Sequence, residues 1–343
     1  MRRFRRTLAA VAVALTVVGG SAGWVSADAQ TAVVGPPPGT AAWQQEGLID
    51  PAASTPHQVA DFFRGLRPER QRELARRHPL VVGNLDGAPV ELRYDANRRS
   101  LAADGRFGRL LASGRQILAF DPRGRGQAAE VYGDLKRAPH VAVVVPGSDM
   151  DAATYDRKKD PYGTPAGMAK SLRAATNDRT AVVAWTGYTT PVGVGIDAAS
   201  GSLAAAGAER LVRFAAGLDA VGVNDPAVFC HSYGSVLCGL AAPRLDASDI
   251  VALASPGMHA DSADRLRTGA RVWAAKDPSD WIGNVPNVRV LGLGHGADPA
   301  APEFGARTVP TGAAHGHTGY FAPGTESLRA FAAIAEHHTP APR

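Results

Sequence analysis

The chain has 343 residues, 45% of them hydrophobic and 20% charged, a composition that excludes a mainly disordered protein. Two cysteines are too few for a disulfide scaffold, and a single apolar run, residues 8–18, excludes a polytopic membrane protein. The formal net charge of +5 falls to +2 without residues 1–29, which hold four arginines and one acid. The basic character therefore belongs to the N-terminus, and we expect no nucleic-acid partner.

Residues 1–29 have the three parts of a secretory signal peptide. Four arginines precede a short apolar run beginning at Leu8, and small residues lead to the Ala27-Asp28-Ala29 site. We predict cleavage after Ala29 or after Ala27, and a secreted or extracytoplasmic location. The alternative is an uncleaved N-terminal membrane anchor, although the run is short for a full span. Membrane association is expected only through such an uncleaved segment.

The first part of the mature chain predicts a linker and a helical extension. Residues 30–40 are rich in Pro and Gly, typical of a linker with nothing to pack. Residues 41–115 predict helices, and the clearest start is Thr55, where Pro56 and Gln58 complete a capping box. The extension could serve as a lid, a cap or extra packing, and the sequence leaves that choice open.

From residue 116 to residue 338, apolar runs alternate with helical patterns. The first two runs predict a hairpin, and the later ones are short, continuous and rich in β-branched residues, typical of parallel strands buried on both faces. Amphipathic helices are predicted between runs and after the last one. This alternation predicts an α/β fold with a mostly parallel, doubly wound sheet and flanking helices. The runs are 117–120, 128–131, 141–145, 181–185, 227–230, 250–254, 272–275 and 288–293.

Ser232 is the strongest candidate nucleophile. It lies between a predicted buried strand and an Ala- and Leu-rich helical segment, the strand–turn–helix context of a nucleophile elbow. Gly234 supplies the small residue that the turn needs two positions later, whereas Cys230 stands where glycine is usual two positions earlier. The alternative, that Ser232 only caps the helix, is weaker because an acid and a histidine follow in the right order.

The acid that orients the base should follow a later strand. Asp277 comes directly after the run 272–275 and before a proline, so we predict that it is the triad acid. Asp280 on the same loop is the second choice, and Asp298 a distant third.

The base should lie on the loop after the last strand. His317, in a Gly-His-Thr-Gly turn just before the final helix, is the predicted base, and His295 is the alternative. His295, His315 and His317 could also form a three-ligand zinc site, but spacing on a loop is a weak signal, and we expect no metal and no cofactor.

Two backbone N–H groups are predicted to hold the oxyanion. One belongs to Tyr233, the residue after the nucleophile. The other comes from the loop after the run 141–145, where we assign Ser148, with Gly147 as the alternative.

The two cysteines, Cys230 and Cys238, flank the elbow. In an exported protein an even count suggests a disulfide. The alternative is two buried thiols that fill space, since the helix carries Cys238 away from the strand and the Cα separation could exceed about 7 Å. The sequence leaves both open.

Several separated motifs resemble those of bacterial secreted α/β-hydrolases of a domain-of-unknown-function type. These are Gly83–Pro89 with Ala96–Arg98, Ala129–Leu135 with His140–Gly147, a W-x-G-Y at Trp185, the H-S-Y-G-S elbow, and Gly316–Phe321. The resemblance spans about residues 50–335 and implies a serine hydrolase with a triad of Ser232, Asp277 and His317. It supplies no substrate.

We therefore predict an exported serine hydrolase, esterase- or lipase-like, that acts on a small-molecule or lipid-like acyl substrate through an acyl-enzyme intermediate. The alternative is a non-catalytic secreted or envelope binding protein built on a hydrolase scaffold.

Overall fold

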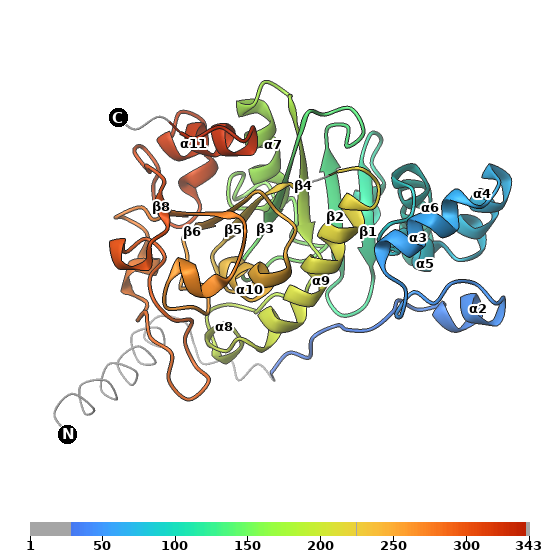
Figure 1. Cartoon of the computed structure of the whole chain (residues 1–343), viewed down its shortest axis with the longest axis horizontal. Helices are drawn as coiled ribbons and strands as arrows, with labels where there is room; N and C mark the ends of the chain where they lie inside the picture. The colour runs from blue at the N-terminus through green and yellow to red at the C-terminus, as the bar shows by residue number, and fades with distance from the viewer. Residues whose placement is uncertain (1–28, 224, 341–343) are drawn as a thin grey trace.

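The computed structural model describes residues 29–223 and 225–340 (Figure 1). The predicted signal peptide, apart from Ala29, lies outside the described residues. Within the described part of the chain, no helix is both long and apolar enough to cross a membrane.

An eight-stranded sheet forms the centre of the described chain (Figure 1). The strand order is β1-β2-β4-β3-β5-β6-β7-β8. β1 pairs antiparallel with β2, and β2 with β4, while the pairs from β4 to β8 are parallel. The strands are β1 (Gln116–Asp121), β2 (Gln127–Tyr132), β3 (His140–Val145), β4 (Thr180–Thr186), β5 (Ala227–His231), β6 (Asp249–Leu253), β7 (Arg271–Ala275) and β8 (Arg307–Thr308). The predicted mostly parallel α/β sheet is confirmed.

Helices cover both faces of the sheet, as the continuous apolar strands require. α7 (Pro165–Ala175) and α11 (Glu326–Ala335) pack with one set of strand side chains, including Val144 and Phe229. α9 (Ser202–Asp219) and α10 (Tyr233–Ala241) pack with the other set. The four-residue helix α8 (Ile196–Ala199) lies in the loop after β4. Single 3₁₀ turns are η1 (Gly108–Leu111), η2 (Ala242–Arg244), η3 (Ala263–Leu266), η4 (Trp281–Asn284), η5 (Pro302–Phe304) and η6 (Gly319–Phe321).

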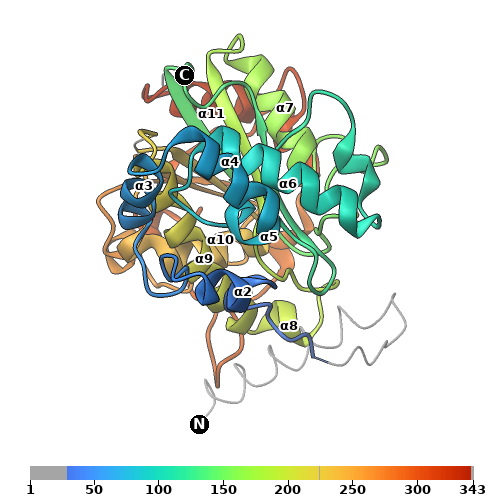
Figure 2. The ribbon, with the colours of Figure 1, turned by 90° about the vertical axis from the view of Figure 1, so that its right-hand side faces the viewer.

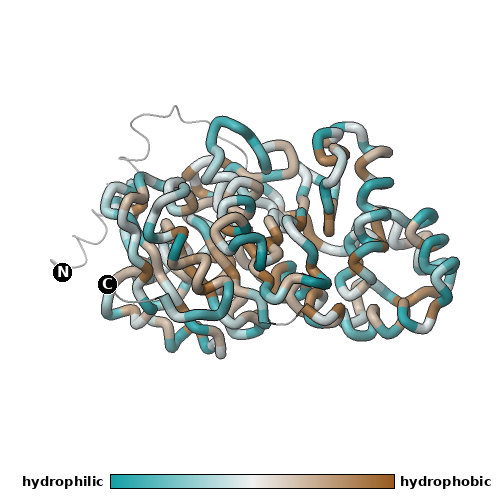
Figure 3. The backbone as a smooth tube through the Cα atoms, turned by 90° about the horizontal axis from the view of Figure 1, so that it is seen from above, coloured by the Kyte–Doolittle hydropathy of each residue, from teal (hydrophilic) through white to brown (hydrophobic). Residues whose placement is uncertain are grey.

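The predicted helical extension has a core of its own and lies beside the β1 end of the sheet (Figures 1 and 2). Trp43, Phe63 and Leu74 are fully buried in that core. Figure 3 shows the extension and the sheet region side by side, with hydrophobic stretches inside each. Its helices are α2 (Thr40–Gln45), α3 (Pro56–Arg64), α4 (Pro68–Arg77), α5 (Pro79–Gly83) and α6 (Val90–Asp104).

The predicted capping box is present at the start of α3. The Thr55 hydroxyl accepts from the Gln58 N–H, and the Gln58 side chain accepts from the Thr55 N–H. A buried ion group then joins the extension to α9, since Asp86 lies 3.1 Å from Arg93 and 3.9 Å from both Arg210 and Arg213. The extension is therefore fastened to the sheet region by charge as well as by apolar packing.

Two predictions about the chain path were wrong. Residues 288–293 form no strand: Leu291 and Gly292 have φ of 52° and 83°, and Val290 pairs with Leu293 across that turn. Glycine and the exposed Leu291 favour this turn over a buried strand, and the last strand is β8. Residues 30–40 are also not a free linker, because the N–H of Val33 donates to the Thr189 hydroxyl.

Candidate active site

Ser232 lies at the turn between β5 and α10, with φ of 54° and ψ of −127°. Positive φ is unusual for a residue with a Cβ, and such strain concentrates at functional sites. The Ser232 N–H donates to Leu253 O of the neighbouring strand β6 at 2.9 Å. The turn therefore holds the serine above the carboxyl end of the sheet while its backbone stays bonded to the strands.

Two glycines make room for this turn. A Cβ on Gly234 would lie 2.7 Å from the carbonyl oxygens of Val145 and Pro146, which cannot move because they belong to the end of β3 and its loop. A Cβ on Gly147 would lie 2.6 Å from Ser232 Cβ. Both positions therefore require glycine, and the β3 loop lies directly against the serine.

His317 lies between the serine and an acid. Its Nε2 is 2.9 Å from Ser232 Oγ, and its Nδ1 is 2.9 Å from Asp280 Oδ1. A histidine that donates from Nδ1 to a carboxylate keeps Nε2 as an acceptor for the serine hydroxyl. The structure thus joins Ser232 and His317, the predicted nucleophile and base.

The acid against His317 is Asp280, the second choice from the sequence, and not Asp277. A turn closed by the Asp280 N–H and the Asp277 carbonyl redirects the chain after β7. This turn carries Asp280, whose side chain is fully buried, beneath the histidine. The prediction that placed Asp277 against His317 is corrected, because the first carboxylate after the strand is used inside the loop.

Asp277 instead organises the loop that faces His317. Its Oδ1 accepts from the N–H and the hydroxyl of Ser279, and Ser279 Oγ in turn accepts from the Gly316 N–H at 2.9 Å. Gly316 directly precedes the histidine. Asp277 is therefore placed to position His317 through Ser279 without touching it.

Tyr320 links the two acidic residues. Its hydroxyl donates to Asp280 Oδ2 at 2.8 Å and accepts from the Asp277 N–H at 2.8 Å. Burial alone would raise the pKa of Asp280, but His317, the Ile282 N–H and the Tyr320 hydroxyl together hold that pKa below its usual range. Asp280 is therefore ionised at neutral pH, as a partner of a histidine that gains a proton must be.

Two aromatic neighbours fix the His317 ring and backbone. His231 Nε2 lies 2.7 Å from the His317 carbonyl oxygen, and burial followed by the nearby His317 lowers the pKa of His231 to about 3. His231 is therefore neutral and donates to that carbonyl. The Trp281 ring lies 4.6 Å from the His317 ring, and its side chain is 42% exposed.

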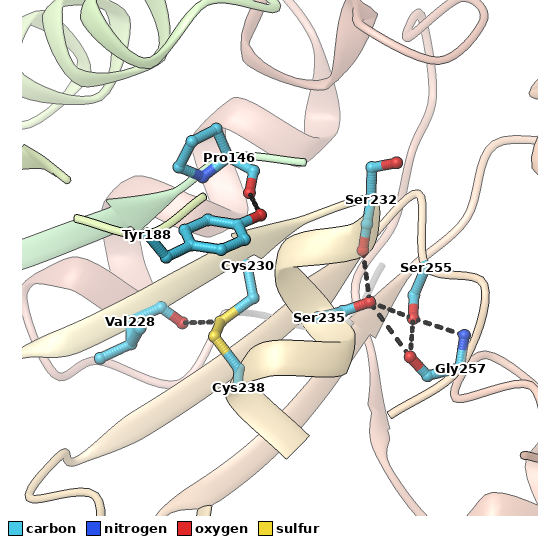
Figure 4. Close-up of a disulfide and its surroundings, with 9 residues drawn as sticks. All are labelled: Pro146, Tyr188, Val228, Cys230, Ser232, Ser235, Cys238, Ser255 and Gly257. Carbon is cyan, nitrogen blue, oxygen red and sulfur yellow. Dashed lines mark hydrogen bonds between the residues drawn. A yellow bond between two sulfur atoms is a disulfide. The ribbon is translucent and has the colours of Figure 1, made fainter. Parts of the chain in front are cut away.

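The predicted oxyanion residues lie on both sides of Ser232. Tyr233 is the first residue of α10, and N–H groups in the first helical turn have no partner within the helix. Ser148 follows Gly147 in the β3 loop. The Tyr188 hydroxyl donates to Pro146 O at 2.8 Å and so steadies this loop (Figure 4).

The other histidines lie elsewhere. His295, the alternative base, is buried, and its Nε2 donates to Ala198 O at 2.7 Å. His315 is exposed. The three histidines of the zinc hypothesis do not gather, and among residues 29–223 and 225–340 no group of three or more His, Cys, Asp or Glu could hold a metal.

A disulfide joins Cys230 and Cys238, with the Cα atoms 6.4 Å apart (Figure 4). The structure thus adopts the first of the two alternatives left open by the sequence. One α10 turn nearer the serine, the Ser235 hydroxyl donates to Ser232 O and contacts Ser255 Oγ, each at 2.6 Å. The disulfide and this hydrogen bond tie the first turns of α10 to the elbow.

Sequence reasoning missed the roles of Tyr320, His231 and Trp281. Their signal was present but ambiguous, because each stands next to or within a few residues of a predicted site residue. Aromatic residues in such positions more often fill a core. Only the fold shows that they contact Asp280 or His317.

The mostly parallel eight-stranded sheet with helices on both faces is an alpha/beta-hydrolase fold. An alpha/beta hydrolase family model matches residues 121–290, in agreement with this fold. The chain is similar to two uncharacterized proteins of Mycobacterium tuberculosis, MT2140 of strain CDC 1551 / Oshkosh and Rv2079 of strain ATCC 25618 / H37Rv. Each is 27% identical over a 376-residue alignment that covers 84% of this chain and 57% of the relative. The chain thus spans little more than half the length of these relatives.

Among solved structures, a predicted CIB-like hydrolase from Thermoplasma acidophilum is 14% identical, with a TM-score of 0.39. That match covers 65% of this chain and 95% of the other.

Proposed function

We propose that this hydrolase is an exported serine hydrolase that cleaves an ester or a related acyl bond through an acyl-enzyme intermediate. The observation that carries the proposal is the hydrogen-bond chain from Ser232 through His317 to Asp280, with 2.9 Å at each step. A serine is a weak nucleophile until a base takes its proton, and this arrangement supplies the base and the acid that orients it.

In the first half of the reaction, Ser232 Oγ attacks the substrate carbonyl carbon while its proton moves to His317 Nε2. Asp280 stays ionised and stabilises the imidazolium through Nδ1–H. The N–H groups of Tyr233 and Ser148 are the proposed donors to the oxyanion. Collapse of the tetrahedral intermediate breaks the bond to the leaving alcohol, which takes the proton from His317, and the acyl group remains on Ser232.

In the second half, water attacks the acyl-enzyme. His317 takes a proton from that water, the tetrahedral intermediate forms again, and its collapse returns the proton to Ser232 and releases the acid. Neutral His231 supports these steps by holding the His317 carbonyl, so that the ring keeps its orientation while its charge changes.

Two features support export. The N-terminal 29 residues have the sequence pattern of a secretory signal, and Cys230 and Cys238 pair as expected outside the reducing cytosol.

Turnover of a p-nitrophenyl ester series tests the proposed chemistry. The wild-type protein is expected to hydrolyse at least the short esters, and Ser232→Ala is expected to lose at least about 10³-fold in kcat. Ser202→Ala, which removes an exposed serine hydroxyl, is the matched control and should not change the rate. Hydrolysis that survives in Ser232→Ala would refute the proposal. Ester binding without turnover by the wild-type protein would favour a binding protein.

A further inference from the structure

Exposed apolar side chains concentrate at one edge of the sheet. Six lie on the loops that follow β4 and β7, and a seventh lies on the N-terminal segment, within the part of the chain that the structure describes. Scattered exposure is ordinary, but concentration on neighbouring loops marks an interaction surface. The six, which we call the apolar rim, are Val192, Val194, Ile196, Trp281, Val288 and Leu291; the seventh is Val34.

The two loops of the apolar rim are joined to each other. Gly294 N–H donates to Ala199 O at 2.9 Å, and His295 Nε2 donates to Ala198 O at 2.7 Å. Figures 1 and 2 both show α8 and the protruding orange turn, residues 288–293, on the same side of the molecule. Leu291 is 96% exposed at the tip of that turn. The rim is thus one continuous structure.

The apolar rim borders the candidate active site. Trp281 lies against His317, at 4.6 Å between ring centroids. On another side, the Gly193 N–H donates to Asp149 Oδ1 at 2.8 Å, which holds the Val192–Val194 stretch beside the loop of Ser148. The Tyr233 hydroxyl donates to Ser200 O at 2.8 Å. A molecule leaving an apolar surface covered by the rim would therefore meet Ser232.

Two carboxylates beside the rim are engaged within the protein. Asp149 accepts from Gly193, and Asp197 accepts from the Gln30 N–H at 2.9 Å. Carboxylates that already have donors resist an approaching apolar surface less than carboxylates that depend on water. The polar groups of this edge are thus compatible with contact to lipid.

The N-terminal end of the described chain emerges at the same edge. The Gln30 side chain donates to Thr190 O at 3.1 Å, and Val33 N–H donates to the Thr189 hydroxyl at 3.0 Å. The apolar run of residues 8–18 precedes this point in the sequence. In the alternative in which that run stays uncleaved as a membrane anchor, the described chain leaves the anchor beside the rim. This observation favours lipid over a protein partner.

We propose that the apolar rim docks on a lipid surface and that the hydrolase takes a long-chain acyl ester from that surface. The proposed substrate, a long-chain acyl ester, rests on the proposed function as a serine hydrolase. The proposed docking on lipid does not depend on that function. Docking is therefore tested in the Ser232→Ala background, where lipid is not consumed. Covalent labelling of the wild-type serine reports the proposed chemistry separately.

A polarity-sensitive fluorophore on a single new cysteine tests the docking. Cys230 and Cys238 are buried and paired, so Leu291→Cys labels selectively in the full chain. Asn177→Cys is the matched control, because Asn177 is also an exposed turn residue and its φ of 49° is close to the 52° of Leu291. Asn177 precedes β4 and therefore lies at the opposite edge of the sheet. With vesicles of phosphatidylcholine and phosphatidylglycerol, the probe at 291 should shift to the blue and brighten, while the probe at 177 should not.

Val194→Asp with Ile196→Asp should weaken the vesicle affinity of the 291-labelled protein by about tenfold or more, because two apolar side chains are replaced by charged ones at the contact. Two outcomes overturn the proposal. One is vesicle binding in which neither probe shifts, because the N-terminal run alone then holds the protein. The other is a concentration-dependent shift at 291 without vesicles, because a second copy then covers the rim.

Discussion

The two regions that build the candidate site are held in place by different means. The elbow that carries Ser232 is fixed by the backbone: a strained φ, a bond to β6 and a glycine that no other residue can replace. The loops that carry Asp280 and His317 are fixed by side chains, through Ser279, Tyr320 and His231. The elbow thus depends on backbone contacts with β3 and β6, whereas the loops depend on side-chain contacts between residues about 40 to 90 positions apart.

Because of that difference, we expect side-chain substitutions to affect folding stability in one region and catalysis in the other. Substitutions in the His317 loops should change catalysis with little effect on folding. Substitutions in the elbow core should change stability more than catalysis, provided Ser232 itself is kept.

The largest expected effect is at Asp280. Asp280→Asn should lower kcat about 10⁴-fold, because an amide that faces Nδ1 favours the wrong histidine tautomer. Asp277→Asn keeps an oxygen that can accept from Ser279, so its loss should stay within about tenfold. Steady-state kinetics on a soluble ester measures both. A larger loss in Asp277→Asn than in Asp280→Asn would identify Asp277 as the triad acid. It would also contradict the description of the loops that hold Asp280 and His317.

The pH dependence of stability should depend on His231. Its pKa is about 3 when folded and ordinarily 6.5, so the unfolded chain binds more protons between these values. Stability is therefore complete above pH 6.5 and is lost as the pH falls toward about 3, by about 1.4 kcal/mol for each unit of pKa difference. Urea unfolding across this window should give a flatter profile for His231→Gln.

That flattening should be partial, because burial also lowers the pKa of His295. Asp280, whose pKa is also lowered, contributes stability that is present above its ordinary pKa of 3.8 and is lost as the pH falls below that value. The exposed His315→Gln is the control, and its profile should match the wild type. An unchanged slope in His231→Gln would mean that this histidine is not the buried neutral group described above.

Removing the disulfide should separate stability from catalysis in the elbow. Cys230→Ala with Cys238→Ala frees a short loop and should lower the free energy of unfolding by about 2 to 3 kcal/mol by the loop-entropy estimate. Turnover at temperatures where the variant is folded should change little, because Gly234 and the Ser235 bond still define the turn. Loss of activity in the folded variant would show that the disulfide itself sets the position of Ser232.

The smallest expected effect is at Tyr320. Tyr320→Phe removes the hydroxyl that donates to Asp280 and should lower kcat about tenfold with little change in KM, as expected for one hydrogen bond to a charged group. Loss of this donor should raise the pKa of Asp280. A change in KM alone, with kcat unchanged, would assign Tyr320 to packing.

The sheet could be predicted from the sequence where the apolar runs were continuous. The prediction failed at one run. Residues 288–293 are as apolar as a strand, but Arg289 and Gly292 interrupt them, and the chain turns there. The two-residue strand β8, Arg307–Thr308, has both side chains exposed and no apolar pattern to reveal it. A short strand that is defined only by backbone pairing with its neighbour leaves no hydrophobic pattern in the sequence.

The sequence predicted those site residues that can be recognised from their neighbours in the chain. The sequence identified Ser232 from its immediate neighbours, and His317 from its place before the last helix. It ranked Asp277 above Asp280, because the choice depends on a turn and on Tyr320, which lies 40 residues beyond Asp280 in the sequence. Contacts of that kind become visible only when the fold brings the two segments together.

The central claim is that Asp280 and His317 activate Ser232. Labelling with a fluorophosphonate, followed by tandem mass spectrometry of the labelled peptide, tests it most directly. The wild-type protein and Asp277→Asn are expected to carry the label on Ser232, whereas His317→Ala and Asp280→Asn should label at least about 10³-fold more slowly. A label on another serine, or equal labelling of Asp280→Asn and the wild type, would contradict the account.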